Sequence, residues 1–455
     1  MCDTGLHLSD HTLGENMADI DTVTETPGLA PKKRVLGFWT CWSLTVGVMI
    51  GSGIFLLPAV LAPYGLMSFA GWMLTGAGSI VLALVLGRLA SRTTRTGGPY
   101  VYAHDAFGDL PGFLVAWGYW ASIWIATPAI AIAFVGYLTV FIPALSDSAM
   151  GQAGAALALI WTLTLISIHG VRDAGFVQII MTFLKLIPLF LIIGLGVVSG
   201  SPDNLPAANP TGQPFFIVLA TTALLTMWAF AGLESGTLPA GQVKDPQKTV
   251  PRAVVIGTIT VTLVYLAATA AVMMLVPAET LENSTSPFAD AARGLGEWGP
   301  KLIAVGALIS TAGSLNGNIF GSGQIPMAVA IDRLAPKIFA KLSPGGSPYV
   351  SLIVSATLGS LLLIANYSGD LVDTFTFLLM MSTLAILAPL FISVIAEIRH
   401  SWRSAKGWAA LAGLGGLYAA FAIFGSGLAV IGWGVLLVLV GIPVFYLGRW
   451  LSHRA

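Results

Sequence analysis

Long apolar runs alternate with short polar connections along most of the chain. A transmembrane helix needs about 20 consecutive, mostly apolar residues, and runs of this length recur from residue 38 onward. We predict twelve spans, at 38–63, 66–90, 109–143, 152–169, 174–199, 214–241, 252–276, 300–331, 348–366, 369–397, 407–425 and 429–449. The third and eighth are longer than a perpendicular crossing requires, so they should tilt or project beyond the bilayer.

The composition agrees with a membrane protein. The 455 residues are 56% hydrophobic and 9% charged, whereas soluble globular proteins carry about 25% charged residues. Basic and acidic residues number 21 each, so no charge imbalance indicates nucleic acid. The two cysteines, Cys2 and Cys41, indicate neither a disulfide framework nor a metal site.

The N-terminal segment, residues 1–34, has a different composition. Up to residue 31 it contains six acidic residues, no lysine or arginine, and few apolar residues. We predict a disordered acidic cytoplasmic tail, which is more simply passive than regulatory. It is not a cleavable signal peptide, because that would need a basic start followed by a short apolar run.

The basic residues between the spans are distributed unevenly. With the N-terminus in the cytoplasm, 18 of the 21 basic residues fall on the cytoplasmic side, and only Arg293 and Lys301 fall on the other side. The remaining one, Lys185, lies within a span. Because positive residues favour the cytoplasmic side, we predict a multi-pass protein of the cytoplasmic (inner) membrane with both termini in the cytoplasm.

Two predicted spans are interrupted near their middles. Gly51-Ser52-Gly53 interrupts the first, and residues 230–235 interrupt the sixth. Glycine costs about 1 kcal/mol relative to alanine inside a helix, and unpaired backbone in hydrocarbon survives only where it lines a cavity or meets a ligand. The two spans lie five helices apart, and such a pair of breaks is typical of inverted-repeat transporters.

The first break has the character of an anion site. Glycine lets the chain leave helical geometry without a side-chain clash, and the half-helix through Ile54 and Phe55 then begins with free N–H groups. The helix dipole places partial positive charge there, which suits a carboxylate. The alternative is that the glycines only permit close helix packing, and the second break in register makes it the weaker interpretation.

Glu234 and Lys185 are ionisable residues deep within predicted spans. A charge at the bilayer centre costs at least about 2.5–3.5 kcal/mol, so each is a functional candidate. Lys185 lies 11 residues beyond Ala174, about 16 Å at 1.5 Å per residue, which is too deep for easy snorkelling. Burial favours a neutral amine, so this lysine could exchange a proton, whereas Glu234 could instead cap freed N–H groups.

Four motifs stand out in this chain: GSGIFLLPAVLAPYG, GGPYVYAHDAFG, WAFAGLESGTLPAGQVKDPQKTVPRA and SPFADAA. They resemble the amino acid–polyamine–organocation superfamily of transporters, and most of all its basic amino acid/polyamine antiporter branch with the arginine/agmatine exchangers. The likeness covers roughly residues 36–450. It implies an all-α membrane protein with a five-plus-five inverted-repeat (LeuT-like) fold, broken helices 1 and 6, and two further helices. The repeats would be residues 35–200 and 201–400, followed by helices 11 and 12 in residues 401–455.

The resemblance also implies two groups of functional residues. Substrate carboxylate and α-amino group would meet the backbone of the two breaks, at Gly51, Ser52 and Gly53 and at Phe230, Ala231 and Gly232. Gating would involve an aromatic side chain over the substrate, an acid linked to pH response, and an aromatic pair near the cytoplasmic gate, which are Trp228, Glu234, Tyr119 and Trp120. Without the resemblance, ordinary helix packing would be the reading of the three aromatic residues.

Three positions depart from the arginine exchangers. Val48 and Thr127 stand where those proteins have asparagines, and Asn318 stands where they have a tryptophan that stacks on the guanidinium. Losing that partner removes a cation–π interaction of about 0.5–2 kcal/mol. We therefore expect a neutral, polar side pocket lined by Thr127 and Asn318, with Ser382 as a further candidate.

Lys185 is a fourth departure, because the arginine and polyamine exchangers lack it. Many uptake permeases and the L-type amino acid transporters have a lysine there, and sodium-coupled relatives hold Na⁺ in the same space. An ammonium group in place of the ion favours proton-linked or cation-independent transport.

These observations predict a secondary active amino acid permease or exchanger that works by alternating access and is linked to protons. The alternative is an arginine/agmatine-type basic amino acid/polyamine antiporter. The expected partners are an amino acid or amine, the proton and the lipid bilayer, with no cofactor, metal or nucleic acid; arginine exchangers form dimers, which leaves a homodimer open. An enzyme is disfavoured because the six histidines lie in tails or near span ends, and a channel because two isolated charges fit a gated site better than a continuous polar pore.

Overall fold

The computed structural model describes residues 37–92, 98–169, 174–233, 243, 245–366 and 370–454. These ranges are helical and contain no strand. The longer helices are α1 (Phe38–Met49), α2 (Ser52–Leu61), α3 (Met67–Arg92), α4 (Pro99–Phe107), α5 (Asp109–Leu138), α6 (Ala149–His169), α7 (Ala174–Ser199), α8 (Phe215–Met227), α9 (Pro246–Leu275), α12 (Trp298–Ile331), α13 (Tyr349–Asn366), α14 (Leu371–Ser401), α15 (Lys406–Gly425) and α16 (Gly427–Arg454). Short helices complete the chain: η1 (Ala62–Tyr64), η2 (Pro143–Leu145), η3 (Pro202–Asn204), η4 (Trp228–Phe230), α10 (Ala278–Leu281), α11 (Pro287–Ala291), η7 (Ala292–Leu295) and η8 (Lys337–Ala340).

Within the described ranges, ten helices are long and apolar enough to cross a membrane. The pair α1 and α2 with η1 forms an eleventh candidate, bent by 41° at its break. The predicted sixth span, 214–241, appears only as the shorter apolar helix Phe215–Phe230, and its remainder from residue 234 lies outside the described residues. The structure therefore confirms a multi-pass all-α membrane protein, while the count of twelve and the two repeats stay predictions.

The two unusually long spans are confirmed. Helix α5 has 30 residues and α12 has 34, about 45 and 51 Å at 1.5 Å per residue, which exceeds the hydrocarbon core of about 30 Å. The short helix α4 was not predicted; it lies between Gly98 (φ 54°) and Gly108 (φ 90°), which supply the left-handed backbone at its ends. The predicted tail lies outside the described residues.

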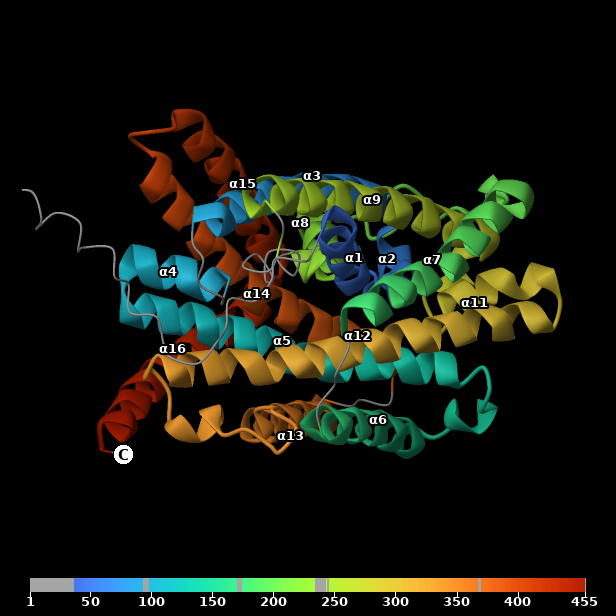
Figure 1. The fold of residues 1–455 in the computed structure, drawn as a ribbon. Coiled ribbons are helices and arrows are strands. Elements are labelled where there is room, and N and C mark those ends of the chain that lie inside the picture. The colour runs from blue at the N-terminus through green and yellow to red at the C-terminus, as the bar shows by residue number, and fades with distance from the viewer. Residues whose placement is uncertain are drawn as a thin grey trace, which may run out of the picture.

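The helices form layers that are visible in Figure 1. In that view α3 and α9 run along the upper edge, α5 and α12 pass through the middle, and α6 and α13 lie along the lower edge. The broken pair α1 and α2, together with α8, lies between the upper and middle layers. Packing follows the same division, because α3 packs on α8 and α9, whereas α5 packs on α12, α13 and α14. The breaks are thus held between two sets of long helices.

Small residues allow these close contacts. Thr75 of α3 bonds to Thr226 of α8 at 2.7 Å, and a Cβ added to Gly71 would lie 2.6 Å from the Cβ of Thr222 on α8. Such interhelical hydroxyl bonds and small-residue contacts are characteristic of helix packing in membranes. They fix α8, which leads into the second break, against α3.

Candidate functional site

The first break lies one residue earlier than the sequence predicted. Helix α1 ends at Met49 and α2 begins at Ser52, with Ile50 (φ −76°, ψ 91°) and Gly51 (φ −137°, ψ −142°) extended between them. Gly53 therefore belongs to the first turn of α2 rather than to the break. The first N–H groups of any helix lack partners within it, so the start of α2 presents free donors in the protein interior.

Both glycines of this segment are in close contact with other helices. A Cβ on Gly51 would lie 2.9 Å from the Cβ of Ser314 on α12. A Cβ on Gly53 would lie 3.0 Å from the Trp228 ring and 3.3 Å from the Cα of Ala229. The two broken segments therefore touch, and the start of α2 faces the turn η4.

The second break follows η4. Ala231 is extended (φ −59°, ψ 132°) and Gly232 has φ 95°, a backbone conformation that favours glycine. Phe230, Ala231 and Gly232 thus form a turn that leaves helical geometry, in agreement with the predicted position. Glu234, the predicted gating acid, lies outside the described residues.

Tyr265 of α9 connects the two breaks, and it was not predicted as a functional residue. Its hydroxyl lies 2.6 Å from the carbonyl oxygen of Met49 and 3.1 Å from that of Ala229. Both carbonyls sit where a helix stops, so their i+4 donors are lost. The side chain is fully buried, and its hydroxyl lies within hydrogen-bond distance of both carbonyls, which holds the end of α1 beside η4.

Lys185 of α7 performs a similar role at the end of α1. Its Nζ donates to the carbonyl oxygen of Gly47 at 3.0 Å, and the residue is 4% exposed. One turn earlier, Thr182 donates to the carbonyl oxygen of Ser43 at 3.1 Å. The described part of the chain shows no ion pair for this lysine, so the C-terminal dipole of α1 is the favourable electrostatic partner of its ammonium form.

The other half-helix has a separate attachment. The hydroxyl of Tyr137 on α5 donates to the carbonyl oxygen of Phe55 at 2.6 Å and accepts the N–H of Phe288 on α11 at 3.2 Å. Helix α2 is therefore fixed to α5 and α11, whereas α1 is fixed to α7 and α9. The two halves of the broken segment have different anchors.

The side-pocket residues come together between α5 and α12. Asn318 donates to Thr127 Oγ1 at 3.0 Å and to the carbonyl oxygen of Ile123 at 2.8 Å. Asn318 follows Ser314, which touches Gly51, by one helical turn on the same face of α12. Ser382 of α14 donates to the carbonyl oxygen of Ser122 at 2.7 Å. The amide and hydroxyl donors are thus engaged with α5, and the surroundings are neutral and polar.

The aromatic residues proposed as gates lie in two places. Trp228 packs edge-on against Phe375 of α14, with ring centroids 6.4 Å apart, and beside Gly53. Trp120 of α5 donates from its indole nitrogen to Ser355 Oγ of α13 at 2.8 Å, and Tyr119 is half-buried on α5. Trp228 therefore lies at the breaks, whereas Trp120 connects α5 to α13.

A buried glutamate on α14 was missed. Glu397 of α14 is 0% exposed and pairs with Arg88 and Arg92 of α3 at 2.9 Å each. It stands at the very end of the predicted span 369–397, so it was not counted as an intramembrane charge. Its position opposite two basic residues in the last turns of another span is the signal that could have found it.

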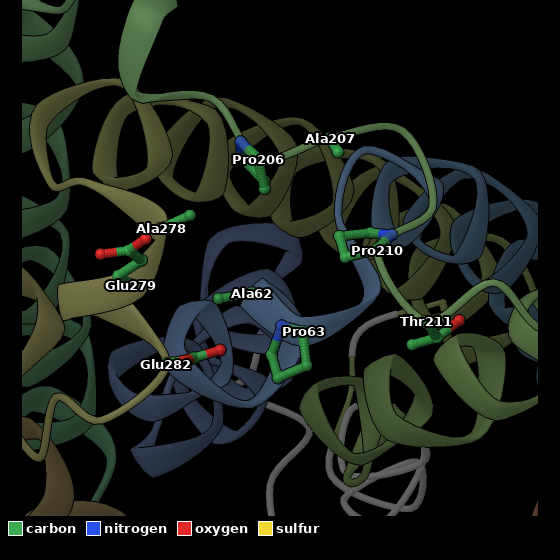
Figure 2. Close-up of a pocket in the computed structure, with 9 residues that line it drawn as sticks. All are labelled: Ala62, Pro63, Pro206, Ala207, Pro210, Thr211, Ala278, Glu279 and Glu282. Carbon is green, nitrogen blue, oxygen red and sulfur yellow. The ribbon is translucent and has the colours of Figure 1, made fainter.

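Two cavities lie away from the breaks. The first, of about 330 Å³, is formed by the end of α2 with η1, the connection after η3, and α10 with the residue that follows it. Figure 2 shows that the Glu282 carboxylate points toward Ala62 and Pro63 in this cavity, which Glu279 also lines. The second, of about 380 Å³, lies between the ends of α7 and α9 and is lined by Asp290 and Arg293. The first break, at Ile50 and Gly51, is buried and closely packed, whereas Ala231 and Gly232 of the second break are half-buried.

A bundle of membrane-length helices, with two broken segments meeting in its interior, is the architecture of a multi-pass transport protein. The family model described as amino acid permease matches residues 36–449. The chain belongs to this amino acid permease family, within the amino acid–polyamine–organocation superfamily.

Relatives with established names agree with this assignment. The chain is 31% identical to the cadaverine/lysine antiporter of Escherichia coli (strain K12), over 91% of this chain and 94% of that one. It is 29% identical to the putrescine transporter of the same organism, over 90% of this chain and 95% of that one. It is 31% identical to a Bacillus subtilis (strain 168) protein provisionally named an arginine/ornithine antiporter, over 80% of this chain and 84% of that one. The protein is a membrane transporter of the basic amino acid/polyamine antiporter branch and not an enzyme.

Proposed function

We propose that this protein is a secondary active transporter of amino acids in the cytoplasmic membrane that works by alternating access. The free N–H groups at the start of α2, from Ser52 and Gly53, receive the substrate carboxylate. Carbonyl groups of the η4 turn, at Phe230, Ala231 and Gly232, receive the α-amino group.

The contact between the two breaks carries this proposal. The start of α2 has the partial positive charge of a helix N-terminus, and the carbonyls that follow a helix end such as η4 lose their partners within the helix. Gly53, in the first turn of α2, lies against η4, because a Cβ added to it would lie 3.3 Å from the Ala229 Cα. A zwitterionic α-amino acid carries an anion and a cation one carbon apart, so it matches two such ends at close range.

A basic amino acid/polyamine antiporter is the second candidate. It is favoured by relatives named for cadaverine, lysine and putrescine, and by two glutamates in the cavity at the end of α2. The neutral pair Thr127 and Asn318 favours an uncharged substrate side chain instead, because among the described residues no carboxylate bonds to either side chain.

Proton linkage is assigned to Lys185. Its ammonium donates to the end of α1, and its loss of a proton would remove the charge and weaken that bond, which would loosen the end of α1 next to the break. We further propose the twelve-span, inverted-repeat arrangement, which is supported by the positions of the two interrupted helices, α1–α2 and α8–η4, five predicted spans apart. Trp228 would cover the bound substrate, with Glu234, Tyr119 and Trp120 acting in gating.

Proteoliposomes test the substrate class. Uptake of labelled alanine, threonine, lysine, arginine, agmatine and putrescine would be measured with and without internal substrate and with and without a pH gradient. The leading proposal expects mutual competition among neutral amino acids and stimulation by an inward proton gradient. Exchange of lysine or putrescine that no neutral amino acid inhibits would instead establish the second candidate.

A further inference from the structure

The buried charge cluster around Glu397 has no role in substrate binding as proposed above. Its carboxylate accepts from Arg88 Nε at 2.9 Å and from both terminal nitrogens of Arg92 at 2.9 and 3.2 Å. Ser401, one turn further along α14, donates to the carboxylate and accepts from Arg92 at 3.2 Å. The Arg88 guanidinium also stacks over the Trp408 ring of α15 at 4.4 Å. Helix α3 therefore meets the distant helix α14 at one fully buried carboxylate, and its Arg88 also contacts α15.

The two sides of this cluster belong to different sets of helices. Helix α3 carries both arginines and packs on α8 and α9, which hold the second break and the bridging Tyr265. Helix α14 carries Glu397 and packs along α5, where Ser382 bonds to Ser122 and Pro389 lies against Gly118. The cluster thus joins α3, which packs on the helices that hold the breaks, to α14, which packs along α5.

A buried carboxylate is tolerated only while its partners are in place. Alternating access moves one set of helices against the other around a fixed site, and the α3–α14 boundary lies between the two sets. A movement of α3 relative to α14 has to break the hydrogen bonds of Glu397, unless the two helix ends move together. Because the side chain accepts four donors from two residues of α3 and one of its own helix, it strongly favours the arrangement in which those helix ends meet.

We propose that Glu397, with Arg88 and Arg92, is a latch that holds the α3 and α14 ends together in this conformation and is released when the transporter opens at that end. Glu397 is a positioning residue that acts on the equilibrium between conformations and not on the substrate. This inference rests on the alternating access of the proposed function. Removing the charge should shift that equilibrium by about 5- to 150-fold, the usual range for coupling between sites.

Distance measurements test the latch without any substrate. Spin labels would be placed at exposed Gln247, at the start of α9, and at exposed Ser404, after α14, in a chain in which Cys2 and Cys41 are replaced by serine. Gly87 of α3 lies against Pro251 of α9, so the first label reports on the α3 side of the cluster. Pulsed electron spin resonance on the full chain in nanodiscs should show a longer-distance population in Glu397→Gln that is minor in the parent protein.

The variants are chosen to separate the latch from general damage. Glu397→Asp keeps the charge and should restore most of the short-distance population. Arg88→Gln leaves the Arg92 pair and should give an intermediate distribution, which keeps the test open if Glu397→Gln does not fold. Glu297→Gln removes an exposed glutamate outside the cluster and should match the parent. Superimposable distributions for the parent, Arg88→Gln and every folded Glu397 variant would overturn the latch.

A cross-link gives the transport readout. Arg92→Cys with Ser401→Cys replaces two side chains that bond to each other at 3.2 Å. Because the arginine side chain is long, a reducible reagent with two thiol-reactive ends and an arginine-length spacer would join the two cysteines. This cross-link should stop exchange and its reduction should restore it, whereas either single cysteine should respond to neither treatment. Full exchange by the cross-linked protein would overturn the latch. Absence of exchange of all six test solutes by the unmodified chain would count against the proposed function alone, because the distance measurement stands independently.

Discussion

Replacing Tyr265 by phenylalanine removes one oxygen atom from the contact between the two breaks. The hydroxyl lies 2.6 Å from the Met49 carbonyl and 3.1 Å from the Ala229 carbonyl, in a fully buried position. A buried polar group left without its partner costs about 1–3 kcal/mol. The single proton bonds to one carbonyl at a time, so we count this cost once. At 1.4 kcal/mol per tenfold, the expected loss is about 5- to 150-fold in the population that holds both breaks in register.

The assay measures substrate affinity and thermal unfolding on the same purified protein. Tyr265→Phe should raise the apparent Kd for the best substrate of the panel by a factor in that range and should lower the melting temperature. Tyr446→Phe makes the same chemical change at an exposed position of α16 and should alter neither quantity. An affinity and melting temperature for Tyr265→Phe within error of Tyr446→Phe would refute the role of this hydroxyl in positioning the breaks.

Three further changes test other parts of the site. Gly53→Val should abolish substrate binding while the protein still inserts, because the new Cβ meets the Trp228 ring at 3.0 Å and overpacking costs about 1–3 kcal/mol. Equilibrium binding measures this, and Gly154→Val, at a position in open space, is the control. Retained affinity would exclude a carboxylate site at Gly53. Lys185→Ala should make uptake insensitive to an imposed proton gradient, measured in proteoliposomes beside Lys301→Ala at an exposed position; an unchanged gradient response would remove this lysine from coupling. Asn318→Ala breaks two bonds to α5 and should change the order of preference among amino acids in the competition panel, and an unchanged order would place the side pocket elsewhere.

The membrane fold and both breaks could be predicted from local sequence, because apolar length and glycine position act over a few residues. Gly232 illustrates this, because its φ of 95° favours glycine and the glycine is visible in the sequence. The long spans α5 and α12 were predicted for the same reason. The exact start of α2 was not, because Ser52 and Gly53 can occupy either a break or a helical first turn.

The contacts that hold the breaks could not be predicted, because their partners are distant along the chain. Tyr265 lies 216 residues from Met49, and Arg88 lies 309 residues from Glu397. The residues around a tyrosine in an apolar run do not indicate which carbonyl it contacts in the fold. A glutamate at the end of a predicted span looks like an ordinary residue that faces the headgroups. Lys185 was recognised because a charge within an apolar run stands out, yet its acceptor, Gly47, was not.

The long-range anchoring of the first broken segment has a consequence for biogenesis. Chains emerge from the ribosome at about 5–20 residues per second, so Tyr265, 216 residues after Met49, follows by on the order of ten to forty seconds. During that interval the carbonyls of Gly47 and Met49 would stand unpaired in lipid if the segment were already broken, and lipid does not tolerate such groups. The newly inserted segment is therefore expected to be a continuous helix, which unwinds at Ile50 and Gly51 only after α7 and α9 have joined it. Assembly of the later helices creates the opening in the first one.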